Sequence, residues 1–385
     1  MLPATTRVLV VGAGPVGLAA AVVLRHLGHE VTVVDSQAEA ANTSRAAVVH
    51  PRTLELLSPY GVVEEMVERG VHTPRFTVRD RDAILVPAPF SNLPTDYPYA
   101  LMLSQADTEA YLLARLRELG GEVVRPATVE RLDREADGVI ATFEDGRQVR
   151  AEYVVGADGM HSTVREQSGI SFTGDTVSQS FSLADVRLGS GVSGRDVILY
   201  FSPAGTLVFV PLPDGLHRVV ATVAEAPEHP DVPFVQRLLD ARGPKRRPAV
   251  VEEVIWGSRF RVHERLADSF RVGRILLAGD AAHVHSPAGG QGMNLGLDDA
   301  VHLGRALAQV LDGASDAVLE TYSDVQLPKA RHVIRLAGRL TSLATVPGAA
   351  RPVRNIALSL AGRMPALQRT LARQLAGLDR PDRAP

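Results

Sequence analysis

Three glycines near the amino terminus have the types and spacing that bind a dinucleotide. Gly12, Gly14 and Gly17 follow the apolar run Val8–Val11 in the pattern G-x-G-x-x-G, and a helix-like segment begins at Pro15. The first glycine permits a tight turn, the second lets the backbone approach a pyrophosphate, and the third lets the helix pack on the strand. The start of the helix directs its free N–H groups at the phosphates. This stretch therefore predicts a dinucleotide site.

An acid closes the second strand of the same unit. Gly28 ends the predicted helix of residues 15–27, a second strand is predicted over residues 29–34, and Asp35 comes next. A carboxylate at this position can bind the hydroxyls of a ribose. The adenosine riboses of NAD and FAD suit such an acid equally, so this unit leaves the identity of the dinucleotide open. A glycine-rich turn in an unrelated α/β protein is the alternative interpretation.

Two later strands also end in a glycine and an acid. The predicted strand Val149–Val155 leads into Asp158 and Gly159, and an apolar strand leads into Gly279 and Asp280. The first of these turns is predicted to cap a short helix, as the turn at Gly12–Gly17 does. The carboxylate of Asp280 can accept hydrogen bonds from the hydroxyls of a sugar chain. One nucleotide seldom needs two such turns, so the repetition is informative.

A glycine-rich loop connects the third turn to another helix start. The loop contains Pro287, and the helix is predicted from about Met293 to Leu311. The free backbone N–H groups around Asn294 form a positive helix terminus, which favours an anion.

Four further polar residues each have two interpretations. Arg45 is either a surface arginine or a group that reaches a phosphate or a flavin edge. Gln105 opens a helix capped by Ser104, where it binds a ligand or satisfies the backbone. His283 and His285 suggest a metal, but no third ligand stands nearby and catalytic zinc usually has three protein ligands. We therefore expect no metal.

The composition limits the class of protein. The chain has 385 residues, a formal charge of -3 and no cysteine. The length suffices for two or three packed units, and the charge argues against a general nucleic-acid binder. Without cysteine, disulfides, thiolate metal sites and cysteinyl-flavin links are excluded. The first strand begins near Met1 and its apolar run is broken by Gly and Pro, so we expect a cytoplasmic protein without signal peptide or membrane span.

Positive charge is concentrated toward the carboxyl end. From Lys329 onward there are 11 Lys and Arg against 2 Asp, or +9, whereas the preceding residues carry 30 minus 42, or -12. We expect C-terminal helices with solvated arginine faces that dock on the acidic body. Binding of phosphate or of a membrane surface by this tail is the sharper alternative and stays open.

The order of the predicted elements indicates an α/β fold whose nucleotide domain is interrupted. From residue 172 to about 265, strands alternate with Gly, Pro and Asp turns, which is typical of an antiparallel sheet. The Pro-rich segment Val86–Tyr99 is expected to be a loop or edge strand that leaves the nucleotide domain. The predicted units are a nucleotide domain over 1–72, 100–171 and 266–340, a substrate domain over 73–99 and 172–265, and C-terminal basic helices over 341–385.

The three glycine-and-acid motifs, in this order, resemble those of the FAD-dependent class A aromatic hydroxylases, which have the para-hydroxybenzoate hydroxylase fold. Within that family the chain is most similar to hydroxylases of aromatic polyketides. The family's first motif binds the ADP part of FAD, the second touches FAD and NAD(P)H, and the third holds the ribityl chain. Arg45 and Gln105 match the family's flavin-facing arginine and glutamine, Val129 matches an adenine-contacting position, and Pro287 matches the segment beside the isoalloxazine ring.

The resemblance covers roughly residues 5–340 and implies a Rossmann-like FAD-binding domain interrupted by an antiparallel-sheet substrate domain, with C-terminal helices. The FAD-binding residues that it implies are Gly12, Gly14, Pro15, Val16, Gly17, Asp35, Ser36, Arg45, Gln105, Val129, Asp158, Gly159, Gly279, Asp280, Pro287, Gly290, Gly292, Met293 and Asn294. Two departures stand out: Asp35 occupies a position where many members have glutamate, and we expect no thioredoxin-like C-terminal domain.

The resemblance also implies an activity. NADPH or NADH would reduce non-covalent FAD, O2 would add to give a flavin C4a-hydroperoxide, and one oxygen atom would pass to an aromatic or polyketide-like small molecule. Pro287 would line the reacting face, and no general base is assigned. We expect a small aromatic substrate as partner, no nucleic acid or membrane, and a monomer or homodimer. An FAD-dependent reductase, dehydrogenase or halogenase of the same fold, and a non-catalytic flavin-binding protein, are the alternatives.

Overall fold

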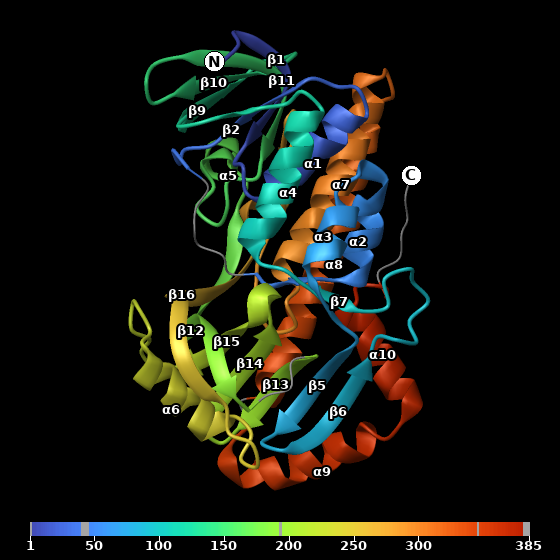
Figure 1. Ribbon diagram of the computed structural model, residues 1–385. Helices are drawn as coiled ribbons and strands as arrows, with labels where there is room; N and C mark the ends of the chain where they lie inside the picture. Colours follow the sequence, from blue (N-terminus) through green and yellow to red (C-terminus); the bar gives the residue numbers. More distant parts are fainter. Residues whose placement is uncertain (1, 40–45, 192–194, 345, 380–385) are drawn as a thin grey trace.

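The computed structural model describes residues 2–39, 46–191, 195–344 and 346–379. Two large β-sheets lie toward opposite ends of an elongated molecule, and the long helices α7 (Gly292–Leu311) and α8 (Ala317–Ala344) run along it (Figure 1). The first sheet contains the parallel strands that precede the glycine turns, and the second is mostly antiparallel. The predicted α/β fold with an inserted antiparallel sheet and C-terminal helices is confirmed.

The first sheet has the strand order β17-β18-β11-β1-β2-β8, with β10 paired to β11 and β9 paired to β10. Its strands are β1 (Thr5–Val11), β2 (Val31–Val34), β8 (Val123–Val124), β9 (Val129–Arg134), β10 (Val139–Phe143), β11 (Gln148–Gly156), β17 (Arg271–Val272) and β18 (Ile275–Leu277).

Three neighbouring strands of this sheet end side by side. β1, β11 and β18 are parallel, Val11 is paired with Gly156, and Gly156 is paired with Leu277. The carboxyl ends of parallel strands meet at one edge of a sheet, and ligands of α/β proteins bind there. The three turns that contain a glycine and an acid are therefore brought together although they are far apart in the sequence.

Helices cover this sheet and fix the edge. α1 (Pro15–His26) packs tightly against α7, because a Cβ on Gly304 would lie only 2.6 Å from a methyl carbon of Val23. The carboxyl halves of β1 and β11 are apolar and almost completely buried, as expected for strands covered on both faces. The other helices of this part are α2 (Pro51–Leu57), α3 (Val63–Arg69), α4 (Gln105–Glu118) and α5 (Thr163–Ser168), with single 3-10 turns η1 (Ser58–Tyr60) and η3 (Gly279–Ala281).

The second sheet has the order β19-β16-β12-β15-β14-β13-β5-β6. Its strands are β5 (Arg75–Asp80), β6 (Ala83–Pro89), β12 (Phe172–Ser190), β13 (Asp196–Ser202), β14 (Gly205–Pro211), β15 (Leu216–Val223), β16 (Val250–Ala267) and β19 (His283–Val284), with the 3-10 turn η2 (Pro213–Gly215). A small third sheet, β3-β7-β4, is formed by β3 (Val48–Val49), β4 (Val71–Thr73) and β7 (Ala100–Met102).

The early segment that leaves the nucleotide domain supplies two strands to the second sheet. β5 pairs with β13 in parallel and with β6 in antiparallel orientation, and β6 forms the edge of the sheet. The segment Val86–Tyr99, expected as a loop or edge strand, thus contains the end of edge strand β6 and continues beyond Pro89 outside it. β16 ends at Ala267, two residues after the expected boundary at residue 265. The domain boundaries themselves stay predictions.

The substrate sheet also carries a helix that the sequence analysis missed. α6 (Val232–Arg242) begins after Asp231, whose side chain accepts a hydrogen bond from the N–H of Phe234 at 2.8 Å. Val235, Leu238 and Leu239 follow at helical spacing and are buried against the sheet. An aspartate N-cap followed by such a triplet is a helix signal that was present in the sequence.

The chain ends in two amphipathic helices after the 3-10 turn η4 (Gly348–Ala350). α9 (Arg351–Ala361) crosses beneath β5 and β6 at the lower end of the molecule in Figure 1, and α10 (Pro365–Leu375) turns back toward the first sheet. Within the described ranges, no helix is both long enough and apolar enough to span a bilayer.

A buried charge pair joins the two long helices. The Lys329 ammonium of α8 lies 3.0 Å from the carboxylate of Asp298 on α7, which also accepts a hydrogen bond from Gln326 at 3.0 Å. Both charged side chains are almost completely buried. A buried ion that loses its partner is far more costly than an intact pair.

We therefore expect Lys329→Met to lower the free energy of unfolding by about 3 kcal/mol. Urea denaturation followed by far-ultraviolet circular dichroism measures the change. The double variant Asp298→Asn, Lys329→Met should recover most of the loss, because it leaves no charge buried without a partner. Equal stability of Lys329→Met and wild type would contradict the role given to this pair.

Candidate cofactor-binding site

The first glycine turn is packed so closely that two of its positions exclude a side chain. A Cβ on Gly12, whose φ is +102°, would overlap the carbonyl oxygen of Ala157, and one on Gly17 would overlap the carbonyl oxygen of Gly12. The turn after β1 therefore rests directly on the turn after β11. Gly14 differs, because no atom beyond its chain neighbours lies within 4 Å of its Cβ position. Open space is thus left before the N-terminus of α1, where a phosphate would meet backbone N–H groups.

Asp35 holds this turn from the end of β2. Its carboxylate accepts hydrogen bonds from the N–H groups of Ala13 at 2.7 Å and Gln37 at 2.9 Å. Arg125 lies 3.8 Å from the same carboxylate and donates to the carbonyl of Ala13 at 3.2 Å. A carboxylate has about four acceptor positions, so Asp35 retains capacity for ribose hydroxyls while it orders the turn.

The second turn is organised by Asp158, whose carboxylate faces inward. It accepts hydrogen bonds from the hydroxyl of Ser162 at 2.5 Å and the N–H of Val164 at 3.1 Å, at the start of α5. Burial raises the pKa of Asp158, and these two hydrogen bonds oppose the increase. Gly159 follows with φ +79° and open space at its Cβ position. The expected helix-capping turn is present, and its acid serves the turn itself.

The third turn is held by an acid from α7 that the sequence analysis did not identify. Asp299 is fully buried, and its Oδ2 accepts a hydrogen bond from the N–H of Gly279 at 3.0 Å and lies 2.6 Å from Nε2 of His283. His283 therefore has a structural partner. In the part of the chain that the structure describes, no group of three or more potential ligands could hold a metal. Asp280 is exposed at the end of β18, as a group that binds sugar hydroxyls must be.

The side chain of Asn294 joins the start of α7 to β3 and α2. Its amide donates to the carbonyls of Val48 at 2.9 Å and Gly290 at 2.8 Å. Its oxygen accepts from the N–H of His50 at 2.7 Å and the hydroxyl of Thr53 at 2.8 Å. What this helix start offers an anion is therefore backbone N–H groups, while the side chain fixes their position.

The other predicted residues lie around these three turns. Pro15 and Val16 begin α1, and a Cβ on Gly279 would lie 2.8 Å from a methyl carbon of Val16. Val129 begins β9 and is buried, whereas Ser36 is exposed after Asp35. The remaining members are half-buried at the start of α7 or in the loop before it: Pro287, Gly290, Gly292 and Met293.

Arg45 lies outside the described residues, but the next residue, Ala46, is held from two directions. Its N–H donates to the Gln105 side-chain oxygen at 3.3 Å, and its carbonyl accepts from the N–H of Gln105 at 3.1 Å. The same carbonyl accepts from Arg218 of β15 at 2.7 Å, and Asp185 of β12 binds that guanidinium through two hydrogen bonds of 2.7 and 2.8 Å. The substrate sheet thus contacts the segment beside Arg45.

A second acid near the first turn was also missed. Glu109 of α4 accepts a hydrogen bond from the Gln105 side chain at 2.9 Å and is almost fully buried. Burial raises its pKa, opposed by the Gln105 hydrogen bond and the positive charge of Arg125 and supported by the negative charge of Asp35. Helical spacing places Glu109 one turn after Gln105, but only the tertiary structure shows that both face inward.

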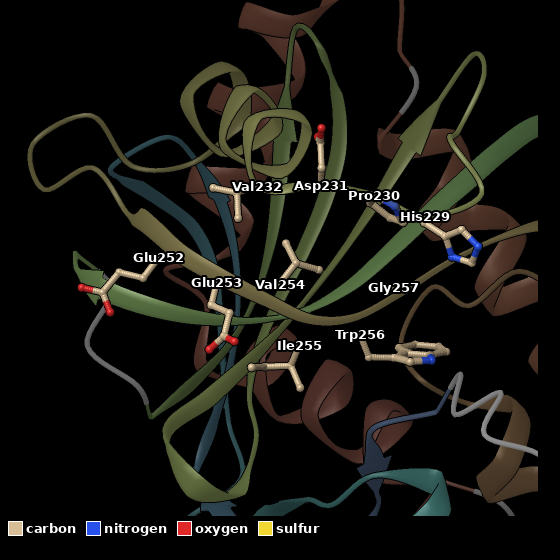
Figure 2. Close-up of a pocket in the computed structure, with 10 residues that line it drawn as sticks. All are labelled: His229, Pro230, Asp231, Val232, Glu252, Glu253, Val254, Ile255, Trp256 and Gly257. Carbon is tan, nitrogen blue, oxygen red and sulfur yellow. The ribbon is translucent and has the colours of Figure 1, made fainter.

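A separate groove of about 600 Å³ lies along β16 (Figure 2). Its lining residues come from the segment before α6 and from β16: His229, Pro230, Asp231, Val232, Glu252, Glu253, Val254, Ile255, Trp256 and Gly257. None of the predicted cofactor residues is among them, so this groove is distinct from the edge that carries the three turns.

Comparison with known proteins agrees with the geometry. A family described as FAD binding domain matches residues 5–337. The chain is 41% identical over 357 residues to 6-methylpretetramide 4-monooxygenase of Streptomyces rimosus, which covers 90% of this chain and 64% of that protein. The chain therefore spans less than two thirds of that relative's length.

Two solved structures share the fold along most of the chain. The p-nitrophenol 4-monooxygenase of Pseudomonas putida has a TM-score of 0.84 and 29% identity, covering 98% of both chains. Aklavinone-11 hydroxylase, solved with FAD and aklavinone, has a TM-score of 0.75 and 29% identity, covering 91% of this chain and 71% of the other. The chain belongs to the FAD-binding class A aromatic monooxygenases.

Two substitutions in the first turn separate packing from cofactor binding. Gly17→Ala should destabilise the apoprotein, because its Cβ overlaps a backbone oxygen, whereas Gly14→Ala should leave the melting temperature unchanged. Gly14→Ala should nevertheless weaken FAD binding about tenfold or more, because its Cβ occupies the space before α1. Thermal denaturation of apoprotein and fluorescence titration with FAD measure the two effects. Wild-type FAD affinity in Gly14→Ala would show that no phosphate lies there.

Glu109 predicts a specific dependence of stability on pH. Because its pKa is raised in the folded state, folding favours the protonated carboxyl, and this contribution is lost as pH rises from the ordinary value of 4.5 through the folded pKa. Glu109→Gln cannot titrate, so the stability of wild type relative to this variant should fall over a range of pH that begins at the ordinary value of 4.5. Urea denaturation across this range measures it, and a constant or rising difference would refute the assignment.

Proposed function

We propose that this chain is a single-component monooxygenase that uses FAD, NADPH or NADH, and O2 to introduce one oxygen atom into an aromatic small molecule. In this reaction a substrate C–H bond, O2, NAD(P)H and a proton give C–OH, NAD(P)+ and water. The observation that carries the proposal is the side-by-side ending of β1, β11 and β18. One edge then offers three separate turns, which suits a long cofactor contacted at several points.

The residues at this edge fit FAD. The open position at Gly14 and the start of α1 would receive the pyrophosphate, and the carboxylate of Asp35 would bind the adenosine ribose. The exposed carboxylate of Asp280 would bind ribityl hydroxyls. Bound FAD would supply hydride acceptance from NAD(P)H and activation of O2. The family to which the chain belongs is described by its FAD-binding domain, which supports this choice.

The chain's own contribution to the chemistry would be electrostatic and positional. α7 begins at Gly292, and the N–H groups of its first turn provide partial positive charge for an anionic ring system. Asn294 keeps this helix start in place through four hydrogen bonds. Pro287, in the loop before α7, would line the reacting face of the flavin ring.

One face of the substrate sheet is suited to an aromatic compound. Phe181 and Phe260 are paired across β12 and β16 and stack with their ring centroids 5.3 Å apart. Asp185 is paired with Trp256 on the same strands, and side chains two residues apart share a face. Arg218 contacts Ala46 from this face, so the face is directed at the cofactor domain.

The charge of this face favours an uncharged substrate. Arg218 already binds Asp185 through two hydrogen bonds and donates to Ala46, so its guanidinium is committed to protein partners. A carboxylate substrate would have to displace Asp185 from the buried guanidinium of Arg218. We therefore propose a neutral phenol or polycyclic phenol rather than an aromatic acid. The names of the relatives, which include a monooxygenase of 6-methylpretetramide and one of p-nitrophenol, support this substrate class.

The decisive experiment incubates FAD-loaded protein with NADPH or NADH, ¹⁸O-labelled O2 and matched phenols and benzoates, with mass spectrometry of the products. We expect one labelled oxygen in phenolic products and none in benzoates. Hydrogen peroxide as the sole product with every phenol would refute the substrate class. Saturated or dehydrogenated products without label would identify a reductase or dehydrogenase instead.

A matched pair of variants tests the site. Asp280→Ala should lower FAD content and turnover, because it removes the acid at the end of β18. Asp268→Ala removes another exposed aspartate, in the turn after β16, and should change neither. Wild-type FAD content and turnover in Asp280→Ala would show that the third turn does not bind the cofactor.

A further inference from the structure

Helix α9 exposes a row of apolar side chains on the side that faces away from the body of the molecule. Most soluble helices bury their apolar side chains, but here Val353, Ile356 and Leu360 are between 59% and 69% exposed. They recur at helical spacing along one face, and Met364 and Leu367, exposed by 54% and 45%, follow after the helix. We call these five residues the apolar stripe. Contiguous exposed apolar groups mark an interaction surface.

The inward face of α9 is held by polar contacts. The buried guanidinium of Arg354 donates to the carbonyl of Leu343 at 3.0 Å and to that of Phe201 at 3.5 Å. The amide of Asn355 donates to Asp80 of β5 at 2.6 Å. These bonds place polar residues of α9 against the body, where Leu358 also packs, and leave Val353, Ile356 and Leu360 outside.

The end of α9 is fixed by a close backbone approach. A Cβ on Gly362, directly after the helix, would overlap the carbonyl oxygen of Leu85 on β6. α9 can therefore not roll over to bury the apolar stripe without breaking this contact and those of Arg354 and Asn355. The contacts of α9 with the body therefore fix the orientation in which the apolar stripe is exposed.

The charge around the stripe selects its partner. The sequence contains no Asp or Glu between Asp324 and Asp379. Arg363 and Arg369 are exposed beside Met364 and Leu367. A second copy docked through the same surface would bring arginines to face arginines, which is unfavourable. An apolar stripe beside arginines, in a segment that itself contains no acid, fits a surface that is apolar within and anionic at its border.

We propose that α9 binds the surface of a membrane that contains anionic phospholipids, with the apolar stripe in the interfacial region and the neighbouring arginines at the headgroups. α9 lies at the end of the molecule away from the first sheet, so the three turns stay clear of the membrane (Figure 1). The helix lies in the surface and does not span it. This inference is independent of the reaction proposed above, because it rests on another part of the molecule.

The test is co-sedimentation of the FAD-loaded protein with vesicles of phosphatidylglycerol and phosphatidylcholine, compared with phosphatidylcholine alone. We expect binding to the anionic vesicles at low ionic strength, weakened by salt. The double variant Ile356→Glu, Leu360→Glu should reduce the partition coefficient about tenfold or more. The matched control Val250→Glu, Ile255→Glu introduces the same two charges at positions of β16 that are 47% and 46% exposed, and should bind as wild type does.

Arg363→Gln combined with Arg369→Gln should weaken binding to anionic vesicles and leave FAD content unchanged. Equal FAD content in all variants shows that a loss of binding does not come from unfolding. The proposal is overturned if wild type does not sediment with anionic vesicles, or if the stripe variant binds as well as wild type. It is also overturned if sedimentation in solution shows a dimer that the stripe variant dissociates, because the occupant is then a second copy.

Discussion

The site depends on the close contact between two glycine turns at the edge of the first sheet. Gly12 packs on the carbonyl of Ala157, and Gly17 packs on the carbonyl of Gly12. These contacts hold the carboxyl ends of β1 and β11 next to each other. No other residue type fits these two positions, since a Cβ would overlap backbone atoms rather than flexible side chains. Gly14, between them in the sequence, has open space at its Cβ position.

Helix α7 transmits this order to the rest of the molecule through consecutive buried acids and one amide. Asp299 holds the third turn at Gly279, and Asp298 ties α7 to α8 through Lys329. Asn294, one turn earlier, holds the segment that leads into α2. A single helix thus fixes the parts that surround the cofactor edge, and the low dielectric of the interior makes each of these bonds costly to break.

The substrate sheet is coupled to the same edge by a charged pair rather than by apolar packing alone. Asp185 and Arg218 come from two paired strands, and the arginine ends on the carbonyl of Ala46. Gln105 binds Ala46 from the cofactor domain, so a movement of either sheet would shift Ala46. At the far end of this sheet, α9 is fastened by Arg354, which leaves the apolar face outward.

The sequence by itself determined the features that depend on neighbours along the chain. The turn at Gly12–Gly17, the cap at Ser104 and the strand ends at Asp158 and Asp280 are encoded by local spacing, and the family follows from their order. Only the tertiary structure decided what depends on distant pairing. The contact between Ala46 and Arg218 spans 172 positions and requires the register of β15, which no local pattern specifies. The exposure of α9 was likewise undecided, because amphipathic spacing defines two faces but not which of them meets the body.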